Sequence, residues 1–233
     1  MCIAAWTWQD HPAYGLLLLF NRDEYHSRPT RPAQWWAAAG EGEEILGGKD
    51  ELGGGTWLGC TKGGKLAFLT NVREPSPRVG ARSRGEHPVR FLQGRQGPLE
   101  YATEIAKEAD QYNGFNLVLA DVRSGTMVYI SNKPGDAPVV QTVSPGCHVL
   151  SNAAIDSLGQ RCCAWDRAST DFLQHMMTQN SIFIDTKKGQ ARYGTRSMAA
   201  IGVKLDGEVT FYERSLASSL WNENVVQFEM MAQ

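Results

Sequence analysis

Two short apolar runs near the start of the chain constrain its fold most strongly. The first covers residues 2–8, the second covers residues 15–20, and Asp10-His11-Pro12 between them is a turn signal. Apolar runs of this length bounded by a turn predict two buried strands that pair as an antiparallel hairpin. The chain must therefore build at least one antiparallel sheet with a well-buried face.

Further segments rich in Val, Ile, Phe, Tyr and Thr end at Gly, Asn or Asp-Gly, which predicts more strands. They cover residues 56–60, 65–70, 115–121, 126–131, 147–151, 197–205 and 208–213. Apolar residues recur with helical spacing in residues 99–109, after Pro98, and in residues 165–176. The predicted class is α+β, with helices on antiparallel sheets. Because no repeat or linker divides the chain, we expect one domain over residues 1–233.

Charge and hydropathy exclude several classes of function. The chain has 23 Lys and Arg against 25 Asp and Glu, so its net charge of −2 gives no general attraction to nucleic acid or acidic membranes. Its purely apolar runs, such as residues 16–20, are far shorter than the roughly 20 residues of a membrane-spanning helix. No basic residue precedes Arg22, and the five cysteines include no Cys-x-x-Cys pair. We therefore expect a cytoplasmic protein without a transmembrane segment or a disulfide framework.

One stretch has the spacing of a phosphate-binding loop, but its chemistry does not fit. Residues 59–66 match that pattern except at the last position, where Leu66 replaces the Ser or Thr that binds magnesium. The residues that follow predict a strand, whereas a phosphate-binding loop precedes a helix. We interpret these glycines as a turn between two strands, and no cluster of Cys and His predicts a metal site.

Cys2 is the first of two features that core packing does not require. If Met1 is removed, Cys2 carries both a thiol and a free α-amine. The pKa of an α-amine is about 7.7–8.0 and that of a thiol is about 8.5, so the amine can accept the thiol proton near neutral pH. The alternative is that Cys2 is a small buried residue at the start of a strand.

The second feature is the polar cluster Asn21-Arg22-Asp23-Glu24, directly after the second apolar run. If the two runs pair as a hairpin, this cluster lies beside Cys2. Arg22 would then favour the thiolate, and Asp23 or Glu24 would hold an α-ammonium group. Taken alone, such a cluster is typical of a solvated turn.

A basic segment over residues 74–97 has two readings. Its arginines are Arg78, Arg82, Arg84, Arg90 and Arg95, and Glu86 is the only acid after Glu74. The segment is interpreted mainly as a loop that forms a basic rim. It is either a solvated set of charges or a set of guanidinium forks that recognise an anionic ligand.

Nine motifs, in order from residue 1 to about residue 215, closely resemble those of the NRDE family, also called the transport and Golgi organisation protein 2 family. They are Met1-Cys2-Ile3, Asn21-Arg22-Asp23-Glu24, Arg28-Pro29, Gly53-Gly54-Gly55-Thr56-Trp57, Leu69-Thr70-Asn71-Val72-Arg73, Ser83-Arg84-Gly85, Tyr112-Asn113-Gly114-Phe115-Asn116-Leu117, His148-Val149-Leu150-Ser151-Asn152 and Tyr193-Gly194-Thr195-Arg196. That family resembles a branch of the N-terminal nucleophile hydrolases. The resemblance implies a four-layer αββα sandwich with the nucleophile at the start of the first strand.

The hydrolases most similar to this family, cholylglycine hydrolases and penicillin V acylases, imply a set of catalytic residues. By resemblance these are Cys2, Arg22, Asp23, Asn71, Asn152 and Arg196. Cys2 would attack a carbonyl carbon, Asn71 would donate to the oxyanion and Asn152 would orient the α-amine. Arg22 and Arg196 would stabilise the thiolate or a substrate carboxylate. Because Arg22 and Asp23 are adjacent and would face opposite sides of a strand, the acid of the site stays open between Asp23 and Glu24.

The resemblance implies a second function, which is to bind or traffic a hydrophobic anion such as haem or an acyl-coenzyme A or lipid. The expected ligand contacts are Asn21, Glu24, Trp57, Arg73 and Arg84, with Trp6 and Trp8 as further aromatic candidates and Arg78 and Arg82 on the rim. No cofactor is expected to be required. Haem would bind non-covalently because no Cys-x-x-Cys-His site occurs, and its axial ligand stays open between Cys2, His26, His87 and His148.

Three functions follow in order of preference. The first is a carrier of the hydrophobic anion, and the second is a cysteine amidohydrolase that cleaves a linear amide or acyl bond through an acyl-Cys2 intermediate. The third, a scaffold in Golgi or membrane traffic, rests on the family name. The resemblance also allows a mitochondrial or Golgi location, and the sequence indicates no protein partner.

Overall fold

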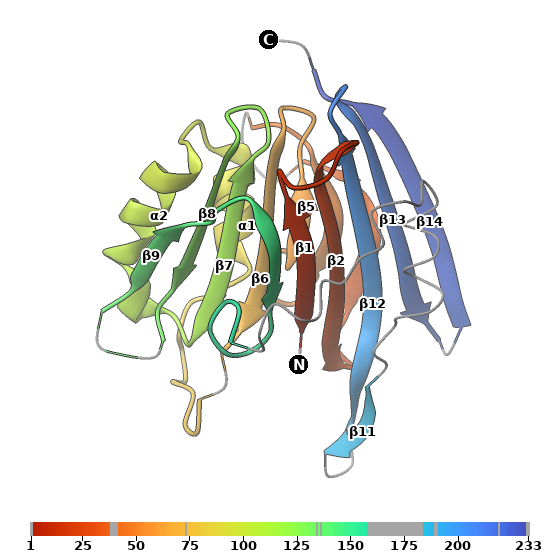
Figure 1. Ribbon diagram of the computed structural model, residues 1–233. Coiled ribbons are helices and arrows are strands. Elements are labelled where there is room, and N and C mark those ends of the chain that lie inside the picture. Colours follow the sequence, from red (N-terminus) through yellow and green to blue (C-terminus); the bar gives the residue numbers. More distant parts are fainter. Residues whose placement is uncertain are drawn as a thin grey trace. The chain divides into compact units, whose positions relative to one another are not determined.

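The computed structural model describes residues 2–37, 42–72, 74–133, 135, 137–157, 184–188, 191–218 and 220–231. The chain divides into two compact units. Figure 1 labels their helices and strands. The first unit is built from Met1–Arg28, Pro145–Ser151 and Asp156–Met230, and the second from Pro29–Ser144, Asn152–Ile155 and Met231–Gln233. Among the described residues, each unit contains one seven-stranded sheet.

The first unit joins both ends of the chain in one antiparallel sheet. Its strands are β1 (Ile3–Trp8), β2 (Tyr14–Tyr25), β10 (Gly146–Leu150), β11 (Asp185–Lys188), β12 (Ala191–Lys204), β13 (Glu208–Ala217) and β14 (Leu220–Glu229). Their order is β10-β1-β2-β12-β13-β14, and β11 pairs with β12. The predicted hairpin is confirmed, because β1 pairs with β2 in a register that sets Ile3 opposite Asn21 and Trp6 opposite Leu18.

The second unit is a meander in which each strand pairs with the next along the chain. Its strands are β3 (Thr30–Trp36), β4 (Ile45–Asp50), β5 (Leu58–Cys60), β6 (Lys65–Asn71), β7 (Phe115–Asp121), β8 (Thr126–Ser131) and β9 (Val139–Thr142). Two helices, α1 (Glu86–Gln93) and α2 (Pro98–Ala106), pack against this sheet, and a short 3-10 turn, η1 (Ala109–Gln111), follows them. Their buried side chains join those of β6, β7 and β8 in one hydrophobic cluster.

Helix α1 is fastened to the sheet at its C-terminal end by Lys65, the first residue of β6. The Lys65 ammonium donates to the carbonyl oxygens of Phe91 at 3.3 Å, Gly94 at 2.6 Å and Gln96 at 2.8 Å. The last carbonyls of a helix lack intrahelical partners and attract positive charge, so one side chain satisfies several acceptors at once. This contact holds the helix end on the strand that leads to Asn71.

All the strands predicted from the sequence are present, β7 and β8 with the predicted boundaries and the others with shifted ones. The hairpin over residues 59–66 is confirmed, since β5 and β6 pair directly and a turn, not a phosphate-binding loop, joins them. The predicted helix over 99–109 appears as α2 followed by η1. The loop interpretation of residues 74–97 is wrong for Glu86–Gln93, which form α1. The helix predicted over residues 165–176 lies outside the described residues.

The α+β class is observed, with antiparallel sheets and helices. Within the part of the chain that the structure describes, both α-helices pack against the sheet of the second unit. The finer expectation of four αββα layers therefore stays a prediction. None of the described helices is long and apolar enough to cross a membrane.

Candidate functional site

Cys2 lies directly before β1, where the β1–β2 register continues to Arg22. Ile3 pairs with Asn21, so the next position places Cys2 opposite Arg22 and on the same face of the sheet. Cys2 is 7% exposed and Arg22 is 5% exposed. The structure therefore brings together the two residues that the sequence placed side by side, in a setting with little access to solvent.

Burial sets the protonation of the Cys2 thiol. Burial raises the pKa of Cys2, whereas the backbone N–H of Asp23, which donates to the sulfur, and the charge of Arg22 both lower it. The net direction is upward, because desolvation disfavours the thiolate more than these two groups stabilise it. The thiol is therefore held in its neutral form around neutral pH.

The carboxylate of Asp23 is fixed from the neighbouring strand, β12. Thr195 lies opposite Asp23 and donates from Oγ1 to Oδ1 at 2.8 Å, while the Tyr193 hydroxyl donates to the Asp23 carbonyl at 3.0 Å. Burial raises the pKa of Asp23, and the hydrogen bond from Thr195 opposes that rise. Asp23 acts on the thiol in two opposite ways, because its backbone N–H donates to the sulfur and lowers the pKa of Cys2, whereas the charge of its carboxylate raises that pKa.

Glu24, the other candidate acid, follows on the same strand and shares the face of Arg22 by alternation. Its side chain is half-buried, and Oε1 accepts the backbone N–H of Tyr25 at 2.8 Å. Asn21, the first residue of the polar cluster, is also half-buried and lies between Ile3 and Met198 in the sheet. The whole cluster is thus the end of β2, not a solvated turn.

Arg196 occupies an irregularity in the β12–β2 pairing. Thr195 pairs with Asp23 and Ser197 with Arg22, so Arg196 is the extra residue of a bulge, a feature that redirects a side chain. Its Nη1 donates to the carbonyls of Tyr25 at 2.8 Å, His26 at 3.1 Å and Arg28 at 3.1 Å. Burial lowers the pKa of Arg196, and the charge of Glu24 acts in the opposite direction. In this arrangement Arg196 holds the turn after β2, and its role toward a thiolate or carboxylate stays a prediction.

The two candidate asparagines belong to the second unit, where they contact each other. Asn152 donates from Nδ2 to the carbonyl of Asn71, the last residue of β6. The Oδ1 atom of Asn152 is buried and has no hydrogen-bond partner among the described residues. Asn152 therefore keeps an acceptor for a ligand or a catalytic group.

A buried polar network that the sequence reasoning missed fixes the segment after Asn152. Asn116, fully buried, donates from Nδ2 to the Ala153 carbonyl at 2.8 Å and to Thr70 Oγ1 at 3.2 Å. The Tyr129 hydroxyl donates to Asn116 Oδ1 at 2.8 Å. An amide side chain within a buried apolar strand was the available signal, since such a group needs partners.

The remaining candidate ligand contacts also lie in the second unit. Trp57 is 8% exposed, and Arg84 donates from Nη1 to the Gly114 carbonyl at 2.9 Å. Arg73 lies outside the described residues. The structure thus places Trp57 and Arg84 in the same unit as Asn71 and Asn152.

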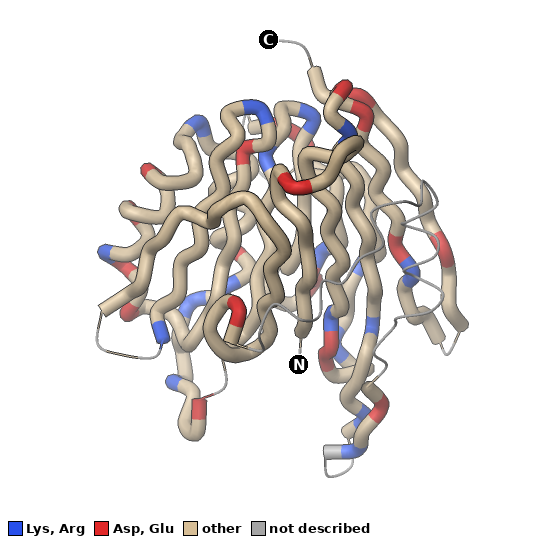
Figure 2. The backbone as a smooth tube through the Cα atoms, in the orientation of Figure 1, with Lys and Arg blue, Asp and Glu red and all other residues tan. Residues whose placement is uncertain are grey.

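Two arginines of the basic segment are paired with acids, which favours the structural reading of these residues. Arg82 and Arg90 both form ion pairs with Glu86 and Glu108 across α1 and the end of α2. Figure 2 shows acidic and basic segments close together in this region. The segment is therefore not a continuous cationic rim.

The histidines named as axial ligands for haem differ in their surroundings. His87 is fully buried against the rings of Tyr112 and Phe115, and burial lowers its pKa to about 3. His148 Nδ1 lies 2.9 Å from Asp156 Oδ2. No group of three His, Cys, Asp or Glu able to hold a metal ion occurs among the described residues. The haem ligand stays a prediction.

Comparisons with known proteins were made against families, individual proteins and solved structures. The model of the family described as Transport and Golgi organisation 2 matches residues 1–178 and 170–218. The Homo sapiens Transport and Golgi organization protein 2 homolog is 32% identical, and the Mus musculus Transport and Golgi organization 2 homolog is 31% identical, over 100% of both chains in each case. A crystal structure of the C2A mutant of conjugated bile acid hydrolase from Clostridium perfringens aligns with a TM-score of 0.49 and 11% identity, covering 97% of this chain and 96% of that one. With a family match along most of its length and full-length relatives above 30% identity, the chain belongs to the Transport and Golgi organisation 2 family.

Proposed function

We propose that this protein binds a hydrophobic anion, haem or an acyl-coenzyme A or related lipid, whose charged group is held at Arg22 beside Cys2. The observation that carries the proposal is the burial of the Arg22 guanidinium next to a thiol that burial keeps neutral. A guanidinium presents paired donors to carboxylate or phosphate, and its interactions strengthen away from water. A neutral thiol is a poor nucleophile, so this arrangement favours binding over catalysis.

The proposal takes the N-terminal nucleophile hydrolase fold, with its four αββα layers, as its framework. Asn21 and Glu24 flank Arg22 on β2 and are the further contacts in the first unit. Trp57, Arg73 and Arg84 remain candidates on the sequence alone. Trafficking of such a ligand would agree with a cytoplasmic protein that visits mitochondrial or Golgi membranes.

The test is a titration of the full-length protein with haemin and, separately, with palmitoyl-coenzyme A. Binding is followed by the Soret band for haemin and by tryptophan fluorescence for both ligands. Arg22→Gln should weaken binding at least tenfold, which corresponds to about 1.4 kcal/mol. Arg22→Lys keeps the positive charge but loses the paired N–H donors of the guanidinium. Its affinity for the ligand should lie between those of the unchanged protein and Arg22→Gln.

Arg192→Gln is the matched control, because it makes the same change of charge in the same unit. Arg192 is exposed and pairs with Asp185 at 2.9 Å on the surface. This variant should bind as the unchanged protein does. The proposal fails if neither ligand saturates the protein, or if Arg22→Gln and Arg192→Gln bind equally well while both remain folded by circular dichroism.

A second candidate function, cysteine amidohydrolysis, has two specific observations in its favour. The Asp23 N–H and the Arg22 charge both favour the Cys2 thiolate against burial, and Asn152 keeps a buried acceptor without a partner among the described residues. In this reaction the Cys2 sulfur would form a thioester with the substrate acyl group. The proton of the thiol would pass through the α-amine to the leaving amine, and water would then hydrolyse the thioester.

The hydrolase alternative requires a free α-amine on Cys2, so intact mass spectrometry must first show loss of Met1. Turnover of a panel of acyl p-nitroanilides should then disappear in Cys2→Ala and persist in Cys147→Ala, a variant of another cysteine in the same unit. Retained Met1, or equal turnover in the two variants, would eliminate the mechanism. The third alternative, a scaffold in membrane traffic, is supported by the family name alone.

A further inference from the structure

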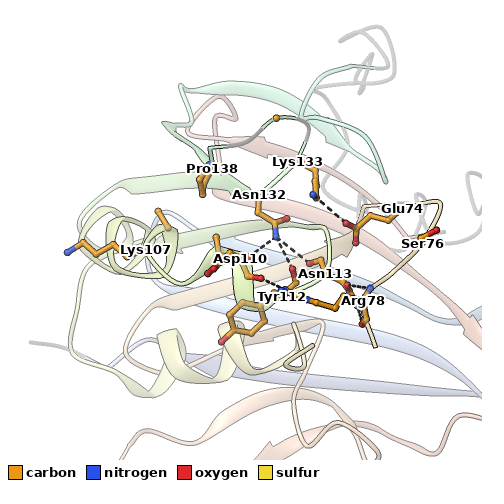
Figure 3. A pocket seen from close by; sticks show the side chains of 13 residues that line it. Glu74, Ser76, Arg78, Lys107, Asp110, Tyr112, Asn113, Asn132, Lys133 and Pro138 are labelled. Carbon is orange, nitrogen blue, oxygen red and sulfur yellow. Dashed lines mark hydrogen bonds and ion pairs between the residues drawn. The ribbon is translucent and has the colours of Figure 1, made fainter. Parts of the chain in front are cut away.

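A polar cavity of about 470 Å³ lies in the second unit, and none of the catalytic candidates named above lines it (Figure 3). Three chain segments form it: the loop after β6, the turn from α2 to β7 and the loop after β8. Its volume falls within the range of small-molecule sites, about 300–1,000 Å³. Most of its side chains are polar, so its occupant must be polar as well.

Hydrogen bonds fix the walls of this cavity before any ligand arrives. Asn132, 9% exposed, donates from Nδ2 to the Ala109 carbonyl at 3.0 Å and accepts the Phe115 N–H on Oδ1 at 2.8 Å. The backbone of Arg78 pairs with the side chain of Asn113, through its N–H at 2.8 Å and its carbonyl at 3.1 Å. A site preformed in this way spends little binding free energy on ordering its own loops.

One charged pair in the cavity is already satisfied. Glu74 accepts the Gly114 N–H on Oε2 at 2.5 Å, and its Oε1 lies 3.5 Å from the ammonium of Lys133. Lys107 also lines the cavity, but its amine is directed away from the other labelled residues (Figure 3). The charges of Glu74, Lys133 and Lys107 are therefore not available to a ligand in the cavity, and its other charged residues must determine which ligand charges it accepts.

The remaining charges are Arg78 and Asp110, which have opposite sign. The Arg78 guanidinium donates to the backbone carbonyl of Asp110, so the two residues lie side by side. Within the described ranges, neither side chain forms an ion pair with another residue. A simple anion would meet the Asp110 carboxylate, and a simple cation would meet the Arg78 guanidinium.

We propose that this cavity binds a small zwitterion with one ammonium and one carboxylate group, the chemistry shared by free amino acids and short peptides. The ligand carboxylate lies on the Arg78 guanidinium, and its ammonium lies on the Asp110 carboxylate. The rest of the ligand occupies the remaining volume of the cavity, which Asn132, Glu74 and Lys133 also line. This inference goes beyond the proposed function, since it concerns a different ligand and residues of one unit.

Calorimetric titration of the full-length protein with four probes tests the inference. L-glutamine and glycyl-L-glutamine carry both charges, N-acetyl-L-glutamine lacks the ammonium, and L-glutaminamide lacks the carboxylate. At least one of the two zwitterions should bind saturably, and each singly charged analogue should bind at least tenfold more weakly than that zwitterion. Tighter binding of glycyl-L-glutamine would identify short peptides as the source of the ligand, and tighter binding of L-glutamine would identify free amino acids.

Asp110→Asn is the decisive variant, because it removes the charge and keeps the backbone carbonyl that Arg78 contacts. It should weaken binding of the zwitterion at least fivefold and leave the melting temperature nearly unchanged. Arg123→Gln, which changes an exposed charge of the same unit outside the cavity, should bind as the unchanged protein does. The inference is overturned if no zwitterion binds, if N-acetyl-L-glutamine binds equally well, or if Asp110→Asn binds without loss.

Discussion

Replacement of His87 by Phe should remove much of the acid sensitivity of the fold. His87 is fully buried in α1, its ring centroid lies 4.1 Å from that of Tyr112 and 4.9 Å from that of Phe115, and neither ring nitrogen has a hydrogen-bond partner among the described residues. Burial, reinforced by the charge of Arg90, lowers the pKa of His87 to about 3. The native state therefore contains a neutral imidazole at any physiological pH.

The magnitude follows from the difference between the folded and unfolded pKa values of His87. An unfolded histidine has a pKa of about 6.5, whereas His87 in the native state has a pKa of about 3. Between these two pH values the imidazole binds a proton in the unfolded chain but not in the native state. The contribution of His87 to stability is thus complete above pH 6.5 and is lost as the pH falls. Between pH 7 and pH 5 the loss is about 2 kcal/mol.

Urea unfolding of both proteins, followed by tryptophan fluorescence at pH 7 and pH 5, measures this difference. His87→Phe should lose about 2 kcal/mol less than the unchanged protein between the two pH values, because other titrating groups cancel in the comparison. Phe91→Leu is the control, since it alters the same helix and the same hydrophobic cluster without a titrating group. It should lower the free energy of unfolding by a similar amount at both pH values. Equal acid losses in His87→Phe and the unchanged protein would refute the reasoning.

Three further substitutions test contacts within each of the two units. Lys65→Met removes the ammonium that serves three carbonyls at the end of α1 and should lower the free energy of unfolding by about 1–3 kcal/mol in urea. Thr195→Val removes the donor to Asp23, so the pKa of Asp23, measured by carboxyl ¹³C NMR, should rise further above its usual value; a fall would contradict the hydrogen bond. Gly55→Ala would place a Cβ 2.2 Å from the Gly85 carbonyl oxygen and should lower the free energy of unfolding, measured by thermal unfolding, by about 2 kcal/mol or more. At Gly97 an added Cβ meets nothing within 4 Å, so Gly97→Ala should change that free energy by no more than about 0.5 kcal/mol.

The first hairpin could be predicted because local pattern and tertiary packing agree there. Two apolar runs and one turn specify the β1–β2 register, and that register alone brings Cys2 opposite Arg22. The bulge at Arg196 could not be read in this way, because it depends on the pairing of β12 with a strand about 170 residues earlier in the chain. The carbonyls that Arg196 serves were therefore also beyond a reading of the sequence.

Helix α1 and strands β4 and β14 were not predicted, because their amino-acid composition is not typical of the structure that they form. Helix α1 contains Pro88, which looks like a helix breaker, but it lies in the first turn, where a missing N–H costs little. Strand β4 contains Gly47 and Gly48, which suggest a turn but serve close packing against the Leu58 carbonyl and the Trp57 ring. Strand β14 is exposed over most of its length, so its sequence shows no buried period.

The topology of the two sheets implies an order of folding. The second unit pairs only strands that follow one another along the chain, and its longest connection runs from Asn71 at the end of β6 to Phe115 at the start of β7. The first unit must join β2 to β12 across 172 residues, as between Asp23 and Thr195, and closing such a loop costs about 4–5 kcal/mol of chain entropy. During synthesis the N-terminal hairpin is made first, yet its partner strand is made near the end. If an aminopeptidase removes Met1, we expect it to act during synthesis, before β12 pairs with β2 and completes the sheet in which Cys2 is buried.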